Sequence, residues 1–198
     1  MTDLQSLVAP TYDDLANLLA GGPAEAWDAP SLCERWQVRH VVAHVTMPAR
    51  LTPEQFGAEM AAAAGDFAVL SNTVAARDAF LPLADLVNAL RSPLLHEWQP
   101  PGGGAVAALS HAVIHSLDVT VALDRPVVAP KEAVIAVLDQ LIAANGEWFG
   151  IVLTGVRFEA ADADWSRGSG DLVRADSGPL VALLSGRSLP DGRALPRR

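Results

Sequence analysis

The sequence predicts a mainly α-helical protein, with a helical bundle over residues 1–150 and a small α+β region over residues 151–198. Three observations support this division. Apolar residues recur at helical spacing in the first part, clusters of Gly and Pro separate the periodic segments, and short runs bounded by Gly, Asp and Ser begin after Gly150. Apolar residues make up 51 % of the chain and charged residues 19 %, a composition typical of a folded domain.

The first part divides into helices at clear breaks. We expect six helical segments, at residues 3–20, 37–50, 53–78, 82–98, 105–124 and 130–148. Pro10 should kink the first segment or mark its true start, and Pro93 suggests a kink or break in the fourth. The run Pro-Pro-Gly-Gly-Gly at 100–104 is the strongest breaker.

After Gly150 the pattern changes to short runs. Residues 152–159 and 171–175 suit strands, and residues 179–184 suit a short helix that ends at Gly186. The tail from 188 to 198 is rich in Pro, Gly and Arg, and we expect it to be frayed.

Charge and apolar content exclude several classes of function. The chain has 14 Lys and Arg against 23 Asp and Glu, a formal net charge of −9 with pI near 4.9, and no basic stripe. This charge argues against nucleic acid as a partner. No run reaches the ~20 apolar residues needed to cross a bilayer, and the start lacks the pattern of a signal peptide. With Cys33 as its single cysteine, the chain is expected to be cytoplasmic and reduced.

The histidines carry the informative chemistry. Four of the five histidines form two pairs with i, i+4 spacing, which are His40 with His44 and His111 with His115. On a helix this spacing places both imidazoles on one face, within reach of a common ion. In both expected helices that face lies away from the apolar stripe. If the two histidine faces meet across a groove of the bundle, they form a divalent-metal site.

Each of these residues also has a plainer interpretation. A single His-x-x-x-His pair often occupies a polar groove or a cap rather than a metal site. Asp118 could accept the free ring N–H of His115, act as a ligand itself, or be a surface acid. Cys33 fits a buried residue of a helix-entry loop better than a nucleophile, and His96 fits a helix C-terminus.

Two segments resemble the metal motifs of a known family. They are PSLCERWQVRHVVAHV at 30–45, and HAVIHSLDV at 111–119 followed by LDRP at 123–126. Both resemble the motifs of the mycothiol-dependent maleylpyruvate isomerase family, within the DinB-like superfamily, and the closing LSGR at 184–187 agrees in order. The resemblance implies a DinB-like four-helix bundle with a small C-terminal α+β appendage. It also implies a divalent metal, zinc first and nickel as the alternative, held by His44, His111 and His115.

The sequence departs from the isomerase pattern at two positions. His111 stands where the isomerase typically has a glutamate, and His40 stands where family members usually have an acid. By resemblance, His40 is a catalytic proton-transfer group or an alternative ligand. Arg187 is a catalytic and cofactor-binding anion contact, or a structural neighbour of a helix end. Trp36, one turn before His40, is expected to wall the site and contact the cofactor.

The leading functional interpretation is a metal-dependent enzyme that uses mycothiol as its thiol cosubstrate. It would be an isomerase or a thiol S-transferase, in which a metal-bound thiolate attacks a small electrophile. The partners would be that electrophile and a low-molecular-weight thiol. Two alternatives remain open: a zinc hydrolase that uses bound hydroxide, and a non-catalytic metal- or ligand-binding module.

Overall fold

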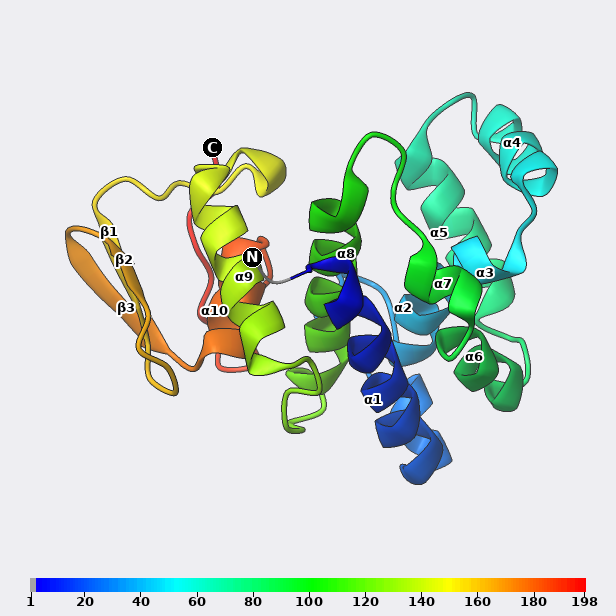
Figure 1. Ribbon diagram of the computed structural model, residues 1–198, viewed down its shortest axis with the longest axis horizontal. Coiled ribbons are helices and arrows are strands. Elements are labelled where there is room, and N and C mark those ends of the chain that lie inside the picture. The colour runs from blue at the N-terminus through cyan, green and yellow to red at the C-terminus, as the bar shows by residue number, and fades with distance from the viewer. Residues whose placement is uncertain (1–2) are drawn as a thin grey trace.

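Helices dominate the computed structural model, which describes residues 3–198 (Figure 1). The helices are α1 (Val8–Gly21), α2 (Val38–Val45), α3 (Met47–Arg50), α4 (Pro53–Ala62), α5 (Phe67–Asp78), α6 (Leu83–Leu90), α7 (Pro93–Glu97), α8 (Gly104–Thr120), α9 (Lys131–Ala143) and α10 (Ser177–Leu184). Short 3-10 turns are η1 (Gln5–Leu7), η2 (Ala24–Asp28) and η3 (Glu147–Phe149). The strands are β1 (Val156–Ala160), β2 (Ser166–Gly168) and β3 (Asp171–Ala175).

The bundle is built around α8, which lies in the middle of the molecule (Figure 1). Helices α1 and α2 pack against α8, and α5 packs against α2. Almost every residue of α8 from Ala108 to Thr120 is buried, because neighbouring helices cover it on several sides. Polar residues on α8 therefore project into the protein. This confirms the predicted mainly α fold and places the second histidine pair inside it.

Several predicted helices are shorter than expected, and local backbone chemistry explains the breaks. The segment 53–78 is two helices, because Ala64 and Gly65 adopt positive φ angles of 53° and 81°. Asp66 then starts α5 by accepting hydrogen bonds from the backbone N–H groups of Ala68 and Val69. The segment 82–98 breaks before Pro93, and 37–50 breaks at Thr46.

Pro10 does not kink α1. It lies in the first turn of the helix, where the backbone nitrogen of each residue lacks an intrahelical partner in any case. The segment 130–148 ends as a helix at Ala143, because Asn145 and Gly146 turn with φ angles of 49° and 72°. A Cβ atom at Gly146 would lie 2.1 Å from the carbonyl oxygen of Ile151, so only glycine fits there.

The C-terminal part is a three-stranded sheet with the order β2-β1-β3. β1 pairs with β2 in antiparallel and with β3 in parallel orientation. The short strand β2 has no counterpart among the predicted elements. Helices α9 and α10 lie between the sheet and α8 (Figure 1), and α10 packs on both α9 and α8. One cluster of buried apolar side chains extends from Leu15 in α1 to Leu184 in α10.

The C-terminal tail differs from the frayed end that its composition suggested. The N–H of Val152 donates to the carbonyl of Pro196 at 2.9 Å, and the N–H of Arg198 donates to the carbonyl of Gly150 at 2.8 Å. Leu189 is buried in the core cluster. The tail is thus held by backbone pairing that a composition count does not reveal. None of the helices within residues 3–198 combines the length and apolar character that crossing a membrane requires.

Candidate metal centre

Three histidines from two helices meet inside the bundle. His44 comes from α2, and His111 and His115 come from consecutive turns of α8. Their ring centroids lie 4.8 to 5.3 Å apart, and one nitrogen from each ring lies within 4.8 Å of the others. The Nε2 atoms of His44 and His111 are 3.3 Å apart. The structure therefore brings together the three residues predicted to be ligands.

A hydrogen bond holds the far side of each ring. Nδ1 of His44 lies 2.9 Å from the hydroxyl of Ser71, and Nδ1 of His111 lies 2.9 Å from the phenol of Tyr12. Nδ1 of His115 lies 2.8 Å from a carboxylate oxygen of Asp118. With Nδ1 engaged in every ring, Nε2 is the nitrogen that is free to face the cluster. Such outer partners are what orient metal-binding histidines.

The cluster fits a divalent cation. Two nitrogens bound at 2.0–2.1 Å to a tetrahedral ion lie ~3.3 Å apart, which matches the observed separation of the Nε2 atoms of His44 and His111. Burial, followed by the charge of His115, lowers the pKa of His44 to about 3. The same two causes, joined by the charge of His44, hold the pKa of His111 well below its usual value. Both rings are therefore neutral at pH 7, which is the form that binds metal.

Asp118 links the cluster to the C-terminal region. Its buried carboxylate accepts hydrogen bonds from Nε of Arg187 at 2.7 Å and from Nη2 at 3.0 Å, in addition to the contact with His115. The thiol of Cys33 donates to the same carboxylate at 3.0 Å. Burial by itself raises the pKa of Asp118, but the hydrogen bonds from His115 and Arg187, together with their charges, hold it far below its usual value. The carboxylate is therefore ionised and fixes the orientation of the His115 ring.

Cys33, His115 and Asp118 form a second group with ligand-like spacing. The guanidinium of Arg187 already neutralises the carboxylate of this group, and its Nη2 lies 3.6 Å from the sulfur of Cys33. A cation placed there would face that positive charge. Burial and the neighbouring carboxylate also raise the pKa of Cys33, so its sulfur stays a thiol. The three-histidine cluster is therefore the better metal site.

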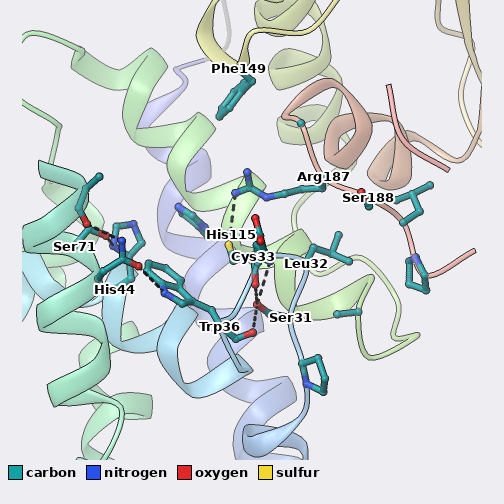
Figure 2. Close-up of a pocket in the computed structure, with 18 of the residues that line it drawn as sticks. Ser31, Leu32, Cys33, Trp36, His44, Ser71, His115, Phe149, Arg187 and Ser188 are labelled. Carbon is teal, nitrogen blue, oxygen red and sulfur yellow. Dashed lines mark hydrogen bonds between the residues drawn. The ribbon is translucent and has the colours of Figure 1, made fainter. Parts of the chain in front are cut away.

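A cavity of about 980 Å³ opens onto the cluster (Figure 2). His44 and His115 reach its wall, with Trp36 on one side and Arg187 on the other. The ring centroid of Trp36 lies 5.2 Å from that of His44, and its indole N–H donates to Asn72. The segment after α10 supplies polar lining groups, including Ser188 and Arg197. Trp36 thus walls the site, as expected, while its contact with a cofactor stays a prediction.

Two predicted site residues have structural contacts of their own. Nδ1 of His40 accepts a hydrogen bond from the backbone N–H of Gln37, which makes it part of a capping box at the start of α2. His40 is not among the residues that line the cavity or meet in the cluster. Arg187 lines the cavity, but Asp118 takes two of its N–H groups. The catalytic roles of His40 and Arg187 stay predictions.

The sequence interpretation missed Tyr12 and Ser71. Tyr12 sits at an apolar position of the helical pattern of α1 and is 1 % exposed, so it looks like an ordinary core residue. Ser71 lies in the weakly patterned stretch between the two histidine motifs. Neither has a local signal, because each acts through a histidine distant in the chain.

The chain resembles known proteins in sequence and in fold. Residues 8–96 match the family model described as "Mycothiol maleylpyruvate isomerase N-terminal domain". A crystal structure of a histidine-to-alanine mutant of the mycothiol-dependent maleylpyruvate isomerase matches 98 % of this chain and 95 % of its own, with a TM-score of 0.55 and 15 % identity. A second structure of that isomerase has the same coverage, a TM-score of 0.47 and 16 % identity. No curated protein matches the sequence. Residues 8–96, a little under half of the chain, are therefore similar to the N-terminal domain of the mycothiol-dependent maleylpyruvate isomerase family.

Proposed function

We propose that this protein is a divalent-metal-dependent enzyme that uses mycothiol, as an isomerase or a thiol S-transferase. The observation that carries the proposal is the convergence of three oriented imidazoles beside a large cavity. His44, His111 and His115 would hold the metal, zinc first and nickel as the alternative. The protein would be located in the cytoplasm, where low-molecular-weight thiols are kept reduced.

The donor set supports thiol chemistry. A divalent ion held by three neutral imidazoles would keep its full positive charge, which lowers the pKa of a thiol that reaches it. The chain's own residues do the rest: Tyr12, Ser71 and Asp118 fix the ring orientations. Burial lowers the pKa of His44 and of His111, which keeps these two rings neutral. Because Cys33 stays protonated and hydrogen-bonded to Asp118, the reactive sulfur must come from a cosubstrate.

The main cavity suits a thiol of the size and polarity of mycothiol. Mycothiol joins an acetylated cysteine to an amino sugar and an inositol, so it carries many hydroxyl groups and no net charge. The cavity of about 980 Å³ has room for such a molecule, and its wall includes Ser31, Asn72, Ser188 and Arg197. The ring of Trp36 offers an apolar face on which a sugar can stack.

Metal content and thiol binding test the proposal. Purified protein should carry about one divalent ion per chain, measured by elemental analysis. Mycothiol at 100 times its Kd should stabilise the metal-loaded protein by about 2.7 kcal/mol in thermal unfolding. A desulfurised mycothiol, which lacks only the thiol, is the matched control and should give a clearly smaller shift.

Other outcomes would favour the alternative functions. If mycothiol gave no shift while simple esters or amides were hydrolysed, the hydrolase interpretation would replace the proposal. If the protein bound metal but responded to neither thiols nor esters, it would be a binding module. Absence of bound metal after expression with added zinc and nickel would remove the basis for all three.

A further inference from the structure

Arg197 is a second arginine in the wall of the larger cavity. It lies near the end of the chain, in the tail that pairs with the segment after η3. An isolated β-bridge joins Arg197 to Ile151, and the N–H of Arg198 donates to the carbonyl of Gly150 at 2.8 Å. This pairing fixes the backbone from which the guanidinium of Arg197 extends beside the candidate metal centre.

The backbone of Gly186 supports the guanidinium of Arg197. Nη2 of Arg197 donates to the carbonyl oxygen of Gly186 at 2.6 Å. Gly186 has a φ angle of 79°, and a Cβ atom there would lie 3.4 Å from Nη2. Glycine therefore allows both the turn after α10 and the close approach of the guanidinium. Ser188 follows two positions later and lines the same cavity, on the far side of Arg187 from His44 in Figure 2.

The charge of Arg197 is not compensated by a carboxylate. Arg187 pairs with the buried Asp118, whereas no ion pair joins Arg197 to an acid within the part of the chain that the structure describes. Glu34, the one acidic side chain among the described residues that line the cavity, is exposed to solvent. Because a guanidinium has five N–H groups and Gly186 accepts only from Nη2, most of these donors are available to a ligand.

The charges around the proposed site leave a positive surplus. A divalent ion on the three histidines would carry two positive charges, of which a bound thiolate would balance one. The pair of Arg187 and Asp118 adds no net charge, and the exposed carboxylate of Glu34 is screened by water and salt. The unpaired guanidinium of Arg197 therefore adds to a positive charge that the thiol leaves unbalanced. Mycothiol carries no carboxylate, so the anionic group that suits Arg197 belongs to the second substrate.

We infer that Arg197, together with the hydroxyl of Ser188, binds a carboxylate of the electrophile and thereby determines which electrophiles react. The planar guanidinium presents two parallel N–H groups to the two oxygens of a carboxylate, an arrangement that a neutral ester or amide cannot match. The cavity of about 980 Å³ is at the upper end of the range for a single small ligand, so an electrophile can lie beside the thiol. The inference rests on the proposed function and adds a substrate-binding residue to it.

Two probes of similar shape and different charge test the anion subsite. Benzoate and benzamide share a planar ring, and NMR titration of the zinc-loaded protein gives the Kd of each. Arg197→Gln should weaken benzoate binding by about tenfold or more and change benzamide binding by less than about twofold. Unchanged benzoate binding in Arg197→Gln would place benzoate on the ion or elsewhere, and would overturn the inference.

Matched variants separate the subsite from net charge. Arg198→Gln removes the same charge from the next residue, whose guanidinium donates to the carbonyl of Asn145 and which is not among the residues that line the larger cavity. It should bind benzoate like the unmodified protein, and a loss equal to that of Arg197→Gln would overturn the inference. Arg197→Lys keeps the charge and should recover part of the affinity. Ser188→Ala should weaken benzoate binding by about threefold, and no change would remove the hydroxyl from the subsite.

Isomerisation of a charged and a neutral alkene tests the role of Arg197 in the reaction. Maleate and dimethyl maleate share one cis double bond, and a thiolate can isomerise each without net change in atoms. The sulfur forms a bond to one alkene carbon while the alkene electron pair moves to the other carbon and its carbonyl. Rotation about the single bond then precedes cleavage of the carbon–sulfur bond, which returns the thiolate and leaves the trans alkene.

With mycothiol as the thiol, Arg197→Gln should lower kcat/KM for maleate by at least about tenfold, mainly through a higher KM. It should change kcat/KM for dimethyl maleate and KM for mycothiol by less than about twofold. A higher KM for mycothiol with unchanged kinetics on maleate would assign Arg197 to the thiol and overturn the inference. If neither alkene is isomerised and mycothiol gives no thermal shift, the proposed function fails. In that case, loss of benzoate binding in Arg197→Gln would still support the anion subsite.

Discussion

The Nε2 atoms of His44 and His111 lie 3.3 Å apart, although 67 positions separate the two residues in the chain. Two unprotonated ring nitrogens repel each other at this distance unless a proton or a cation lies between them. Both Nδ1 atoms are engaged with hydroxyl groups, so Nε2 is the nitrogen of each ring that a cation between them would contact. The metal proposal therefore depends most directly on this pair.

Replacing His111 should abolish tight metal binding. His111→Ala leaves only His44 and His115, and elemental analysis should show a fall from about one ion per chain to well below half. Affinity, measured by competition with a chromophoric chelator, should fall by at least about a hundredfold. His40→Gln is the matched histidine control and should keep its metal. If His40→Gln lost its metal while His111→Ala retained it, the metal site would include His40 and not His111, and the proposed ligand set would be wrong.

The hydrogen bonds to the Nδ1 atoms of the histidines should raise metal affinity, although the metal can still bind without them. Tyr12→Phe and Ser71→Ala each remove the hydroxyl that is hydrogen-bonded to one Nδ1 atom, at His111 and His44 respectively. We expect metal affinity to fall by about ten- to a hundredfold in each variant, with the ion still bound at high metal concentration. Thr11→Ser, a neighbouring change of a buried hydroxyl residue on α1, should leave affinity unchanged. Unchanged affinity in both test variants would mean that packing alone orients the rings.

The histidine pairs could be predicted from the sequence because helical periodicity is local. Residues four positions apart on one helix share a face whatever surrounds them, so His111 and His115 could be paired before any fold was known. The same argument paired His40 with His44 equally well, yet only His44 reaches the cluster. Nothing in the spacing reveals that the N-terminus of α2 needs a cap, which engages His40.

Contacts between residues distant in the chain were harder to predict, because helical periodicity carries information only about residues close in the sequence. Tyr12 and Ser71 reach the site from α1 and α5, which the chain brings together with the histidines only on folding. Arg187 could be named beforehand only through the family resemblance, and its pairing with Asp118 was not foreseen. The tail after Ser188 looked frayed by composition, but it pairs with residues 150–152. Helix breaks at Gly65 and Gly146 depend on positive φ angles that composition only suggests.

The pair of Asp118 and Arg187 should matter to both stability and metal affinity. Asp118→Asn leaves the guanidinium unpaired in a site where it is 18 % exposed, and it weakens the hold on His115. We expect a loss of about 2–4 kcal/mol in urea unfolding and a tenfold or greater loss of metal affinity. Arg187→Lys keeps the positive charge but loses the bidentate contact with the carboxylate, so it should lower the free energy of unfolding by less than Asp118→Asn does. If Arg187→Lys unfolds more readily than Asp118→Asn, the contacts of the guanidinium with the carbonyl of Ser185 and the sulfur of Cys33 contribute more to stability than its pairing with this carboxylate.

Two substitutions at His40 separate its cap from its predicted proton-transfer role. Glutamine at this position of a capping box can also accept from the backbone N–H of Gln37, whereas alanine cannot. If the cap is its whole role, His40→Gln keeps both stability and turnover, and His40→Ala loses about 0.5–1 kcal/mol of stability. A large fall in kcat for His40→Gln with unchanged unfolding would restore the catalytic prediction.

The ion pairs of Asp78 should make the stability of the bundle depend on pH. Burial by itself raises the pKa of Asp78, but hydrogen bonds and charges from Arg77 and Arg50 bring it below its usual value. Arg50 also donates to the carbonyl of Ala43, beside His44, so this pair fixes the end of α2 on α5. Asp78→Asn should therefore cost about 1–3 kcal/mol at pH 7.

The sign of the pH effect follows from the lowered pKa of Asp78. The unfolded chain binds a proton at Asp78 near its usual pKa of about 3.9, above the pH at which the folded protein does. The stabilisation is thus fully present above about pH 5 and is lost as pH falls through the folded pKa. The free energy of unfolding of the unmodified protein and of Asp78→Asn should be measured in urea from pH 7 to pH 3. The difference between the two should stay constant down to about pH 5 and become smaller below about pH 4. A difference that persisted unchanged to pH 3 would assign the effect to packing, because an uncharged contact does not titrate.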